Sequence, residues 1–155
     1  SEAHMVALRA VSRGVPVTGA MMTRFATLVP RAHIDEAVQT LLQTSQGEFP
    51  VVDDAGKPIG IIGRADLIRA IKTVGPNASV ADAMGVEMPT VSHRATLEQA
   101  FKLLQQKQAP AVGVVDASGA LVGLVTGETI AEMMMLQEAL PRDVKIGPWS
   151  CPAGI

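Results

Sequence analysis

The spacing of hydrophobic residues between positions 27 and 73 predicts an ordered series of helices and strands. Residues 32–44 place apolar side chains three and four positions apart, which predicts a helix with one apolar face. Residues 49–52 and 59–62 are short apolar runs joined by the turn-forming sequence "DDAGK", so they predict a β-hairpin. Residues 64–73 return to helical spacing, and residues 27–30 form a short β-prone stretch that ends in proline.

The same pattern of residues occurs a second time along the chain. Residues 17–68 shifted by 80 − 17 = 63 positions align with residues 80–131 without a gap. "VTGAM" then meets "VADAM", "RAHIDEA" meets "RATLEQA", and "FPVVDDAGKPIGII" meets "VGVVDASGALVGLV". The second copy therefore predicts a helix over 96–107, a hairpin that turns at "DASGA", and a final helix over 127–140.

The repeat divides the 155-residue chain into four parts. The opening "SEAHM" is typical of an expression scar, so residues 1–16 are interpreted as that scar and a lead-in. Residues 17–76 form the first repeat, and residues 77–140 form the second. Residues 141–155 contain three prolines and two glycines, which predicts an irregular tail. Because neither copy is expected to close a core alone at this size, the two repeats are expected to pack against each other.

Composition and charge narrow the classes of partner. Apolar residues make up 48% of the chain, which is enough for a packed core, and the formal net charge is −2. A chain without a basic surface is not expected to bind nucleic acid. No apolar run of 18 residues and no signal-peptide pattern occur, so we expect no membrane contact by this fragment itself. The single Cys151 agrees with a reducing compartment, and we expect a cytoplasmic location.

Motifs that would indicate catalysis or a metal site do not occur. His33 and His93 occupy non-equivalent positions in the two copies, and no H-x-H, C-x-x-C or G-x-S-x-G motif occurs. The sequence "GKPIG" lacks the spacing of a phosphate-binding P-loop. The sequence therefore predicts no catalytic residue and no metal ligand.

The duplicated hairpin sequences resemble the CBS domain family over about residues 17–136. This resemblance implies an α+β fold, a tandem CBS domain pair (Bateman module) with two β-α-β-β-α repeats packed about a pseudo-twofold axis. It also implies a regulatory module without chemistry of its own that controls an attached effector domain. The ligand that the family implies is an adenosyl compound between the repeats: AMP, ADP, ATP or S-adenosylmethionine.

A narrower resemblance concerns the effector. "AMMTRFATL", "QGEFPVVD" and "EMMM" are similar to the cytoplasmic CBS tails of bacterial site-2-type intramembrane zinc proteases. The chain has no H-E-x-x-H motif. On this resemblance it would be the regulatory tail of an inner-membrane metalloprotease, without the catalytic part.

The family phrase Gly-apolar-apolar-Thr/Ser-x-x-Asp lies where a strand passes into a helix, and each repeat keeps half of it. The first copy has Gly63 in place of the hydroxyl and keeps the acid at Asp66, whereas the second keeps Thr126 and has Thr129 in place of the acid. A hydroxyl at the helix N-cap can bond a free amide or a phosphate. A carboxylate in the first turn can accept hydrogen bonds from a ribose diol.

Two interpretations follow from this division. In the first, a nucleotide binds at the first copy with Asp66 on the ribose and Arg64 near the phosphates. In the second, Asp66 is only a favourable acid in the first turn of a helix, Thr126 is only a cap, and neither cleft binds a ligand. In the ligand-binding interpretation, Thr27, Pro50 and Val51 line the adenine end of the first cleft. Thr126 and Thr129 are the candidate residues of the second cleft.

The final helix carries Met133, Met134 and Met135 in succession. Three consecutive residues cannot all face one side of a helix, so at least one points away from the core of its own repeat. We therefore expect a homodimer or partner contact on this helix. Trp149 docks either on the repeats or on sequence outside the chain. The alternative function is a ligand-free dimerisation and interaction scaffold.

Overall fold

The computed structural model describes residues 14–85 and 87–139, in two compact units. The first-repeat unit contains Arg24–Met88 together with Ser118–Leu121. The second-repeat unit contains residues 14–23, 89–117 and 122–139 of the described chain. The tail over 141–155, with Trp149 and Cys151, and the opening "SEAHM" lie outside the described residues. The packing of the repeats about a pseudo-twofold axis stays a prediction.

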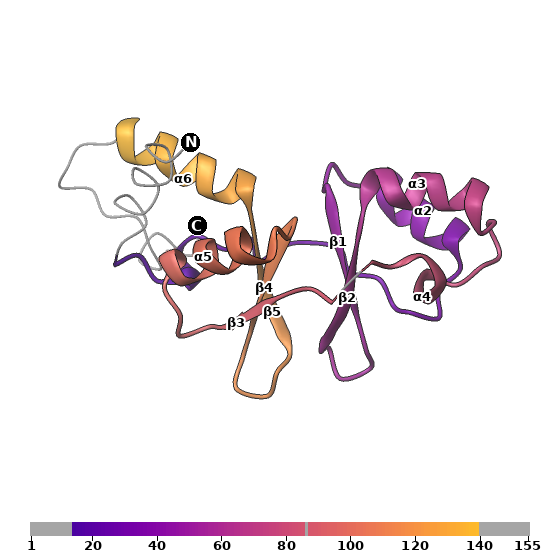
Figure 1. The fold of residues 1–155 in the computed structure, drawn as a ribbon, viewed down its shortest axis with the longest axis horizontal. Coiled ribbons are helices and arrows are strands. Elements are labelled where there is room, and N and C mark those ends of the chain that lie inside the picture. Colours follow the sequence, from indigo (N-terminus) through magenta and orange to yellow (C-terminus); the bar gives the residue numbers. More distant parts are fainter. Residues whose placement is uncertain (1–13, 86, 140–155) are drawn as a thin grey trace. The chain divides into compact units, whose positions relative to one another are not determined.

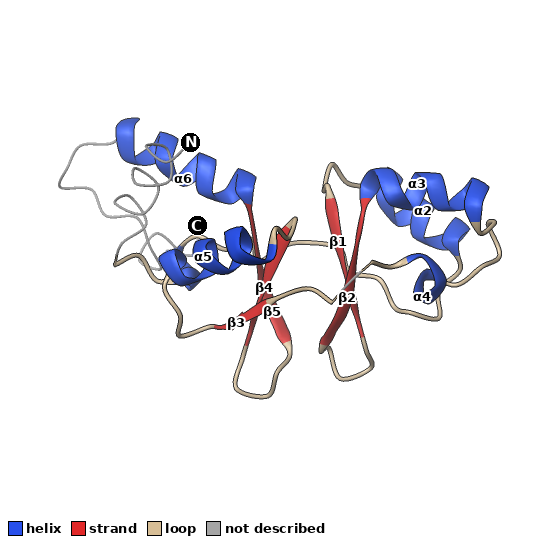
Figure 2. Ribbon diagram, in the orientation of Figure 1, coloured by secondary structure: helices blue, strands red, loops and turns tan. Residues whose placement is uncertain are grey.

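The first-repeat unit is built on an antiparallel hairpin, as the sequence predicts (Figure 1). Strand β1 (Glu48–Val52) pairs with β2 (Pro58–Gly63), and the helix α3 (Arg64–Thr73) follows directly. Helix α2 (Ile34–Leu42) packs beside α3, on the same side of the hairpin (Figure 2). The short helix α4 (Val80–Ala83) completes the unit and was not expected from the sequence.

The second-repeat unit repeats this arrangement. It contains η1 (Val17–Gly19), β3 (Thr90–Ser92), α5 (Leu97–Lys107), β4 (Ala111–Val115), β5 (Leu121–Thr126) and α6 (Gly127–Ala139). The strand order is β3-β4-β5, with β3 parallel to β4. This combination of helices and strands confirms the α+β fold class.

The first strand of each repeat differs between the units. In the second unit the expected stretch forms β3, but residues 27–30 form only one parallel bridge, between Leu28 and Val51. The amide of Leu28 donates to the carbonyl of Pro50 at 2.9 Å, and the amide of Val52 donates to the carbonyl of Leu28 at 2.9 Å. The stretch cannot extend beyond this bridge because Pro30 lacks an amide proton.

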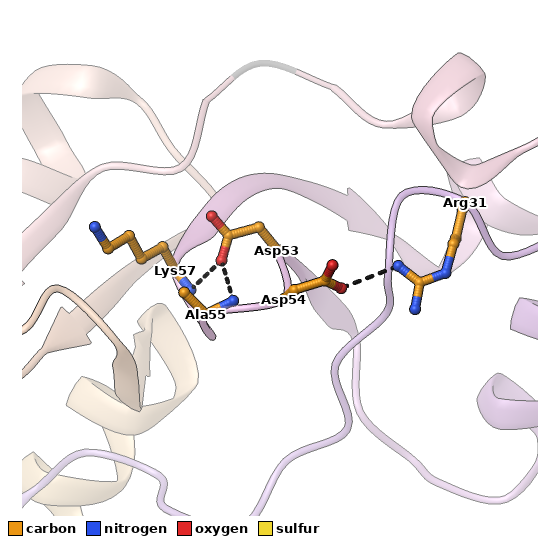
Figure 3. Close-up of polar contacts among 5 residues, drawn as sticks. All are labelled: Arg31, Asp53, Asp54, Ala55 and Lys57. Carbon is orange, nitrogen blue, oxygen red and sulfur yellow. Dashed lines mark hydrogen bonds and ion pairs between the residues drawn. The ribbon is translucent and has the colours of Figure 1, made fainter.

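The side chain of Asp53, the first residue of the turn, stabilises the turn of the first hairpin (Figure 3). Asp53 Oδ1 accepts hydrogen bonds from the amides of Ala55 and Lys57, both at 2.9 Å. Gly56 has φ +80°, which a residue without Cβ adopts without strain. The exposed Arg31 and Asp54 form an ion pair of 3.0 Å beside this turn. The "DDAGK" turn expected from the sequence is therefore confirmed.

Each compact unit contains the first segment of the other sequence repeat, and the boundaries at 17–76 and 77–140, which describe the repeats along the chain, stay a prediction. The segment 15–22 at the start of the first repeat packs in the second unit, where the amide of Val17 donates to Ala95 at 2.9 Å. The segment 78–85 packs in the first unit, where the amide of Val80 donates to Ala32 at 2.8 Å. These two bonds join residues that are equivalent in the repeat, since 80 − 17 and 95 − 32 both equal 63. The lead-in also contributes to the fold, because the buried Val15 accepts a 2.8 Å hydrogen bond from the first amide of α5.

Each unit has a core of its own, which includes a fully buried valine from the other repeat's first segment. Val17 and Val80 are both 0% exposed. The core of the first unit contains Leu28, Ile34, Ala37, Leu41, Phe49, Val51, Ile62, Leu67, Ala70 and Val80. The core of the second contains Val15, Val17, Leu97, Ala100, Phe101, Leu104, Val112, Val114, Val125, Ile130 and Met133.

The three consecutive methionines of α6 face different surroundings. Met133 is buried in the core, Met134 packs against its edge, and Met135 is 68% exposed. The expectation that one of them points away from the core is confirmed. No helix among the described residues is both long enough and apolar enough to cross a membrane.

Candidate functional site

The junction between β2 and α3 holds the acid of the family phrase. Gly63 is the N-cap of α3, with extended backbone angles and no side-chain hydrogen bond to the helix. The first amide of α3, on Arg64, donates to the carbonyl of Gly47 at 2.8 Å. The junction is therefore tied to the loop that follows α2, and the N-terminal turn of α3 has no side-chain cap.

The Arg64 side chain bonds to the protein's own backbone. Its Nη1 donates to the carbonyls of Thr44, at 2.8 Å, and Gln46, at 3.0 Å. The sequence interpretation assigns this guanidinium to ligand phosphates. In the structure it instead fixes the α2–β1 loop against the start of α3. The sequence does not predict these two hydrogen bonds, because the carbonyls lie more than 15 positions away in the chain.

Asp66 lies in the first turn of α3 with its side chain exposed. Its Oδ1 is 2.6 Å from Nη1 of Arg69, one helical turn further on. Exposed pairs of this kind contribute about 0–1 kcal/mol, so the contact is easily exchanged for another hydrogen-bonding partner. Asp66 is thus placed where a ligand hydroxyl could reach its carboxylate.

A second carboxylate, which sequence reasoning missed, lies beside Asp66. Glu48 opens β1 and pairs with Gly63 across the hairpin. Burial raises the pKa of the half-buried Glu48 carboxyl above its ordinary value, and the nearby Asp66 carboxylate raises it further. Counting residues outward from the predicted "DDAGK" turn would have placed Glu48 near Gly63.

The residues expected at the adenine end separate into two groups. Pro50 and Val51 are buried in β1, and the Val51 side chain belongs to the core. Only their backbone is available to a ligand, and the carbonyl of Pro50 already accepts from Leu28. Thr27 is exposed, one residue before that bridge.

The equivalent junction in the second repeat is closed by its own side chains. Thr126 and Thr129 bond reciprocally: the amide of Thr126 donates to Thr129 Oγ1 at 3.2 Å, and the amide of Thr129 donates to Thr126 Oγ1 at 3.3 Å. The two hydroxyl oxygens are 3.3 Å apart, and Thr129 is 8% exposed. This reciprocal arrangement caps α6 in the manner of a capping box. The interpretation of Thr126 as a cap therefore has direct structural support.

The described residues contain one group of side chains with the composition of a metal site, at the start of α2. His33, Asp35 and Glu36 offer ligand atoms within 4.8 Å of one another, and all three are exposed. Their contacts are those of a helix start: Glu36 Oε1 accepts from the amide of His33 at 3.2 Å, and Asp35 Oδ1 accepts from the amide of Glu36 at 2.8 Å. Capping accounts for these residues without a metal.

Comparisons with known proteins agree on the family. The profile of the CBS domain matches residues 16–73 and 80–136. An inosine-5'-monophosphate dehydrogenase of Thermoplasma acidophilum is 31% identical over 114 residues, which cover 73% of this chain and 22% of that enzyme. The chain spans from about a fifth to under half the length of the first curated relatives that it matches.

Solved structures show the same fold. The crystal structure of CBSX2 in complex with AMP superposes with a TM-score of 0.68 at 26% identity, covering 81% of this chain and 99% of that one. The CBS domain of a bacterial CNNM/CorC family Mg²⁺ transporter in complex with ATP gives a TM-score of 0.74 at 19% identity, covering 86% of this chain and 96% of that one. At that identity the second likeness concerns the fold alone.

Proposed function

Because this chain belongs to the CBS domain family, we propose that it is a regulatory module that binds an adenosyl ligand and thereby controls an attached effector. The observation that carries the proposal is the β2–α3 junction. There the family's acid is kept at Asp66, exposed beside a glycine N-cap, at the start of a helix without a side-chain cap. The AMP in the similar CBSX2 structure supports an adenine nucleotide or related adenosyl compound as the ligand.

The geometry favours the first repeat over the second. At the second junction Thr126 and Thr129 already satisfy each other. Binding a ribose or phosphate there would require that capping pair to open, at a cost of about 1 kcal/mol. At the first junction a ligand would displace only the exposed contact between Asp66 and Arg69.

The interior of the first repeat restricts the roles of the other expected residues. Val51 and Pro50 could contact an adenine through the backbone of β1, and Thr27 could contact it from the preceding stretch. Arg64 would act by holding the loop before β1 in place. A regulatory effect requires that the ligand bind two arrangements of the chain with unequal affinity.

Thermal unfolding with and without adenosyl ligands tests the proposal. A ligand at 100 times its dissociation constant adds about 2.7 kcal/mol, which at this chain length raises the midpoint by about 5–10 °C. Asp66→Ala should weaken binding by about 10- to 100-fold, since a hydrogen bond to a charged group contributes about 1.5–3 kcal/mol. Asp35→Ala removes an exposed first-turn acid from another helix, α2, and is the control, expected to bind as the wild type does. No shift with adenosine, AMP, ADP, ATP or S-adenosylmethionine would reject the proposal.

A ligand-free scaffold is the second candidate function. It is favoured by the side chains of Met135 and Leu136, which are 68% and 48% exposed on the last helix. A homodimer through α6 would cover them. Light scattering of the wild type and of Met135→Lys tests this: the scaffold predicts a dimer that the lysine disrupts, with no ligand effect on the melting temperature.

The effector and the cellular location stay predictions. The likeness to the cytoplasmic tails of intramembrane zinc proteases rests on "AMMTRFATL", "QGEFPVVD" and "EMMM", and it implies a membrane metalloprotease as effector. In this proposal the chain itself contributes binding and no catalytic residue.

A further inference from the structure

Three positions that differ between the repeats meet at one point of the first unit. Glu48, Gly63 and Asp66 correspond to Ala111, Thr126 and Thr129 at the offset of 63. In the second repeat, two hydroxyls cap the helix and a small residue opens the first strand of the hairpin. In the first repeat, a glycine takes the cap position and two acids take the other places. The three differences are thus a coordinated change at one site.

In the first repeat, the carboxylates of Glu48 and Asp66 lie close to the position that the threonine side chain occupies in the second repeat. A Cβ at Gly63 would lie 3.3 Å from Glu48 Oε2 and 3.4 Å from Asp66 Oδ2. The other Glu48 oxygen would lie 3.6 Å from the same point. Both carboxylates therefore converge on the position from which a cap side chain would extend. A threonine there would press against Glu48, whereas the counterpart Ala111 carries no such group.

The charge at this point opposes a further anion. The amides at a helix N-terminus favour negative groups, which is why phosphates bind there. At α3 the protein itself supplies two carboxylates, and the effect of Asp66 on the pKa of Glu48 shows that they repel each other. A ligand phosphate would be a third negative group beside a half-buried acid, and like charges in such a setting disfavour binding.

We propose that Glu48 determines the charge of the ligand that the first repeat accepts. Its carboxylate occupies the place at the start of α3 where a phosphate would bind. The repeat then takes an adenosyl ligand whose 5′ substituent is uncharged or cationic, with S-adenosylmethionine as the representative, in preference to AMP, ADP or ATP. Asp66 remains the acceptor for the ribose. This inference rests on the proposed function, since it specifies the ligand of the same site.

Isothermal titration of the full chain with adenosine, S-adenosylmethionine, AMP and ATP tests the assignment. The wild type should bind adenosine and S-adenosylmethionine at least about tenfold more tightly than AMP or ATP. Glu48→Gln keeps the shape and removes the charge, so it should raise the affinity for AMP and ATP about tenfold and change that for adenosine less than about twofold. Glu87→Gln, an exposed glutamate of the same unit, is the matched control and should change none of the four affinities.

The outcomes separate this inference from the function on which it rests. If adenosyl ligands bind but Glu48→Gln leaves the preference between adenosine and AMP unchanged, Glu48 does not set ligand charge and only this inference is overturned. If the wild type binds AMP or ATP more tightly than adenosine, the inference about Glu48 is likewise overturned and the proposed function stands. If none of the four ligands binds to the wild type or to Glu48→Gln, the proposed function itself fails. Asp66→Ala should weaken the binding of all four ligands by about 10- to 100-fold, in the wild type and in Glu48→Gln alike. Unchanged affinities in Asp66→Ala would place the ligand elsewhere. Circular dichroism of each variant confirms that it is folded.

Discussion

Met84 lies over Gly60 so closely that a Cβ at position 60 would come within 2.8 Å of its sulfur. The two residues belong to different repeats in sequence but to one compact unit. Their equivalents, Met21 and Gly123, make the same contact in the other unit. Each hairpin thus carries a glycine because a methionine from the neighbouring repeat's first segment packs on it.

Gly123→Ala should destabilise the protein by about 1–3 kcal/mol, the usual cost of overpacking. The new methyl group would lie 2.7 Å from Cγ and 3.1 Å from Cβ of Met21, so moving the end of the methionine does not relieve the contact. Gly60→Ala should cost less, because only the flexible end of Met84 comes within 3 Å. Urea denaturation measures both.

Adding Met21→Ala to Gly123→Ala is the control for this packing. The shorter side chain should make room for the new methyl group, so the two effects should be less than additive. Strictly additive costs would show that the Met21–Gly123 contact is not their origin.

Thr129→Val should lower the free energy of unfolding by about 1 kcal/mol, a typical cost of losing a cap. Valine keeps the shape of the buried side chain but cannot bond Thr126. Thr129→Ser keeps the hydroxyl, and if capping is its role, serine should preserve more of the stability than valine does. Equal stability of the valine variant and the wild type in urea denaturation would argue against the cap.

Arg64→Gln should destabilise the fold by about 1–3 kcal/mol in the absence of ligand, because two backbone carbonyls lose a charged donor. Arg69→Gln is the matched control on the same helix. Its exposed pair with Asp66 should contribute less than about 1 kcal/mol. If the two variants melt at the same temperature without ligand, the loop contact of Arg64 does not matter for stability.

Glu48→Gln should be more stable than the wild type at neutral pH and should lose that advantage in acid. The pKa of Glu48 is raised in the folded state above its ordinary value of 4.5, mainly by burial, so the folded chain holds this proton more tightly than the unfolded chain does. Stability contributed by this group therefore falls as pH rises from about that value through the raised pKa.

Urea denaturation of the wild type and of Glu48→Gln between pH 4 and pH 8 measures this difference. Glu87→Gln controls for the loss of one negative charge in the same unit. A constant difference between wild type and Glu48→Gln across that range would show that Glu48 titrates alike in the folded and unfolded chain.

The sequence by itself determined the duplication, both hairpins and their turns, and the helices that carry the apolar faces. The duplication is visible from matches 63 positions apart, and the other features depend on residues within a few positions of one another. For example, α3 occupies residues 64–73 as expected, and the Asp53 and Gly56 of the turn lie within its five residues. The position of Asp66 in the first turn of a helix follows from the same local pattern.

Only the tertiary structure decided which repeat each connecting segment completes, and which groups surround Asp66. Val17 packs in a core whose helices and strands lie more than seventy positions further along the chain. The entropy cost of closing a long loop is only slightly larger than that of closing a short one, and the burial of the valine outweighs this cost. Arg64 bonds carbonyls about twenty positions back, and Glu48 faces Gly63 through a strand register that one slipped residue would reverse. Apart from the approximate position of Glu48, which the predicted hairpin turn implies, local spacing contains none of these contacts, since they depend on how separate elements pack in space.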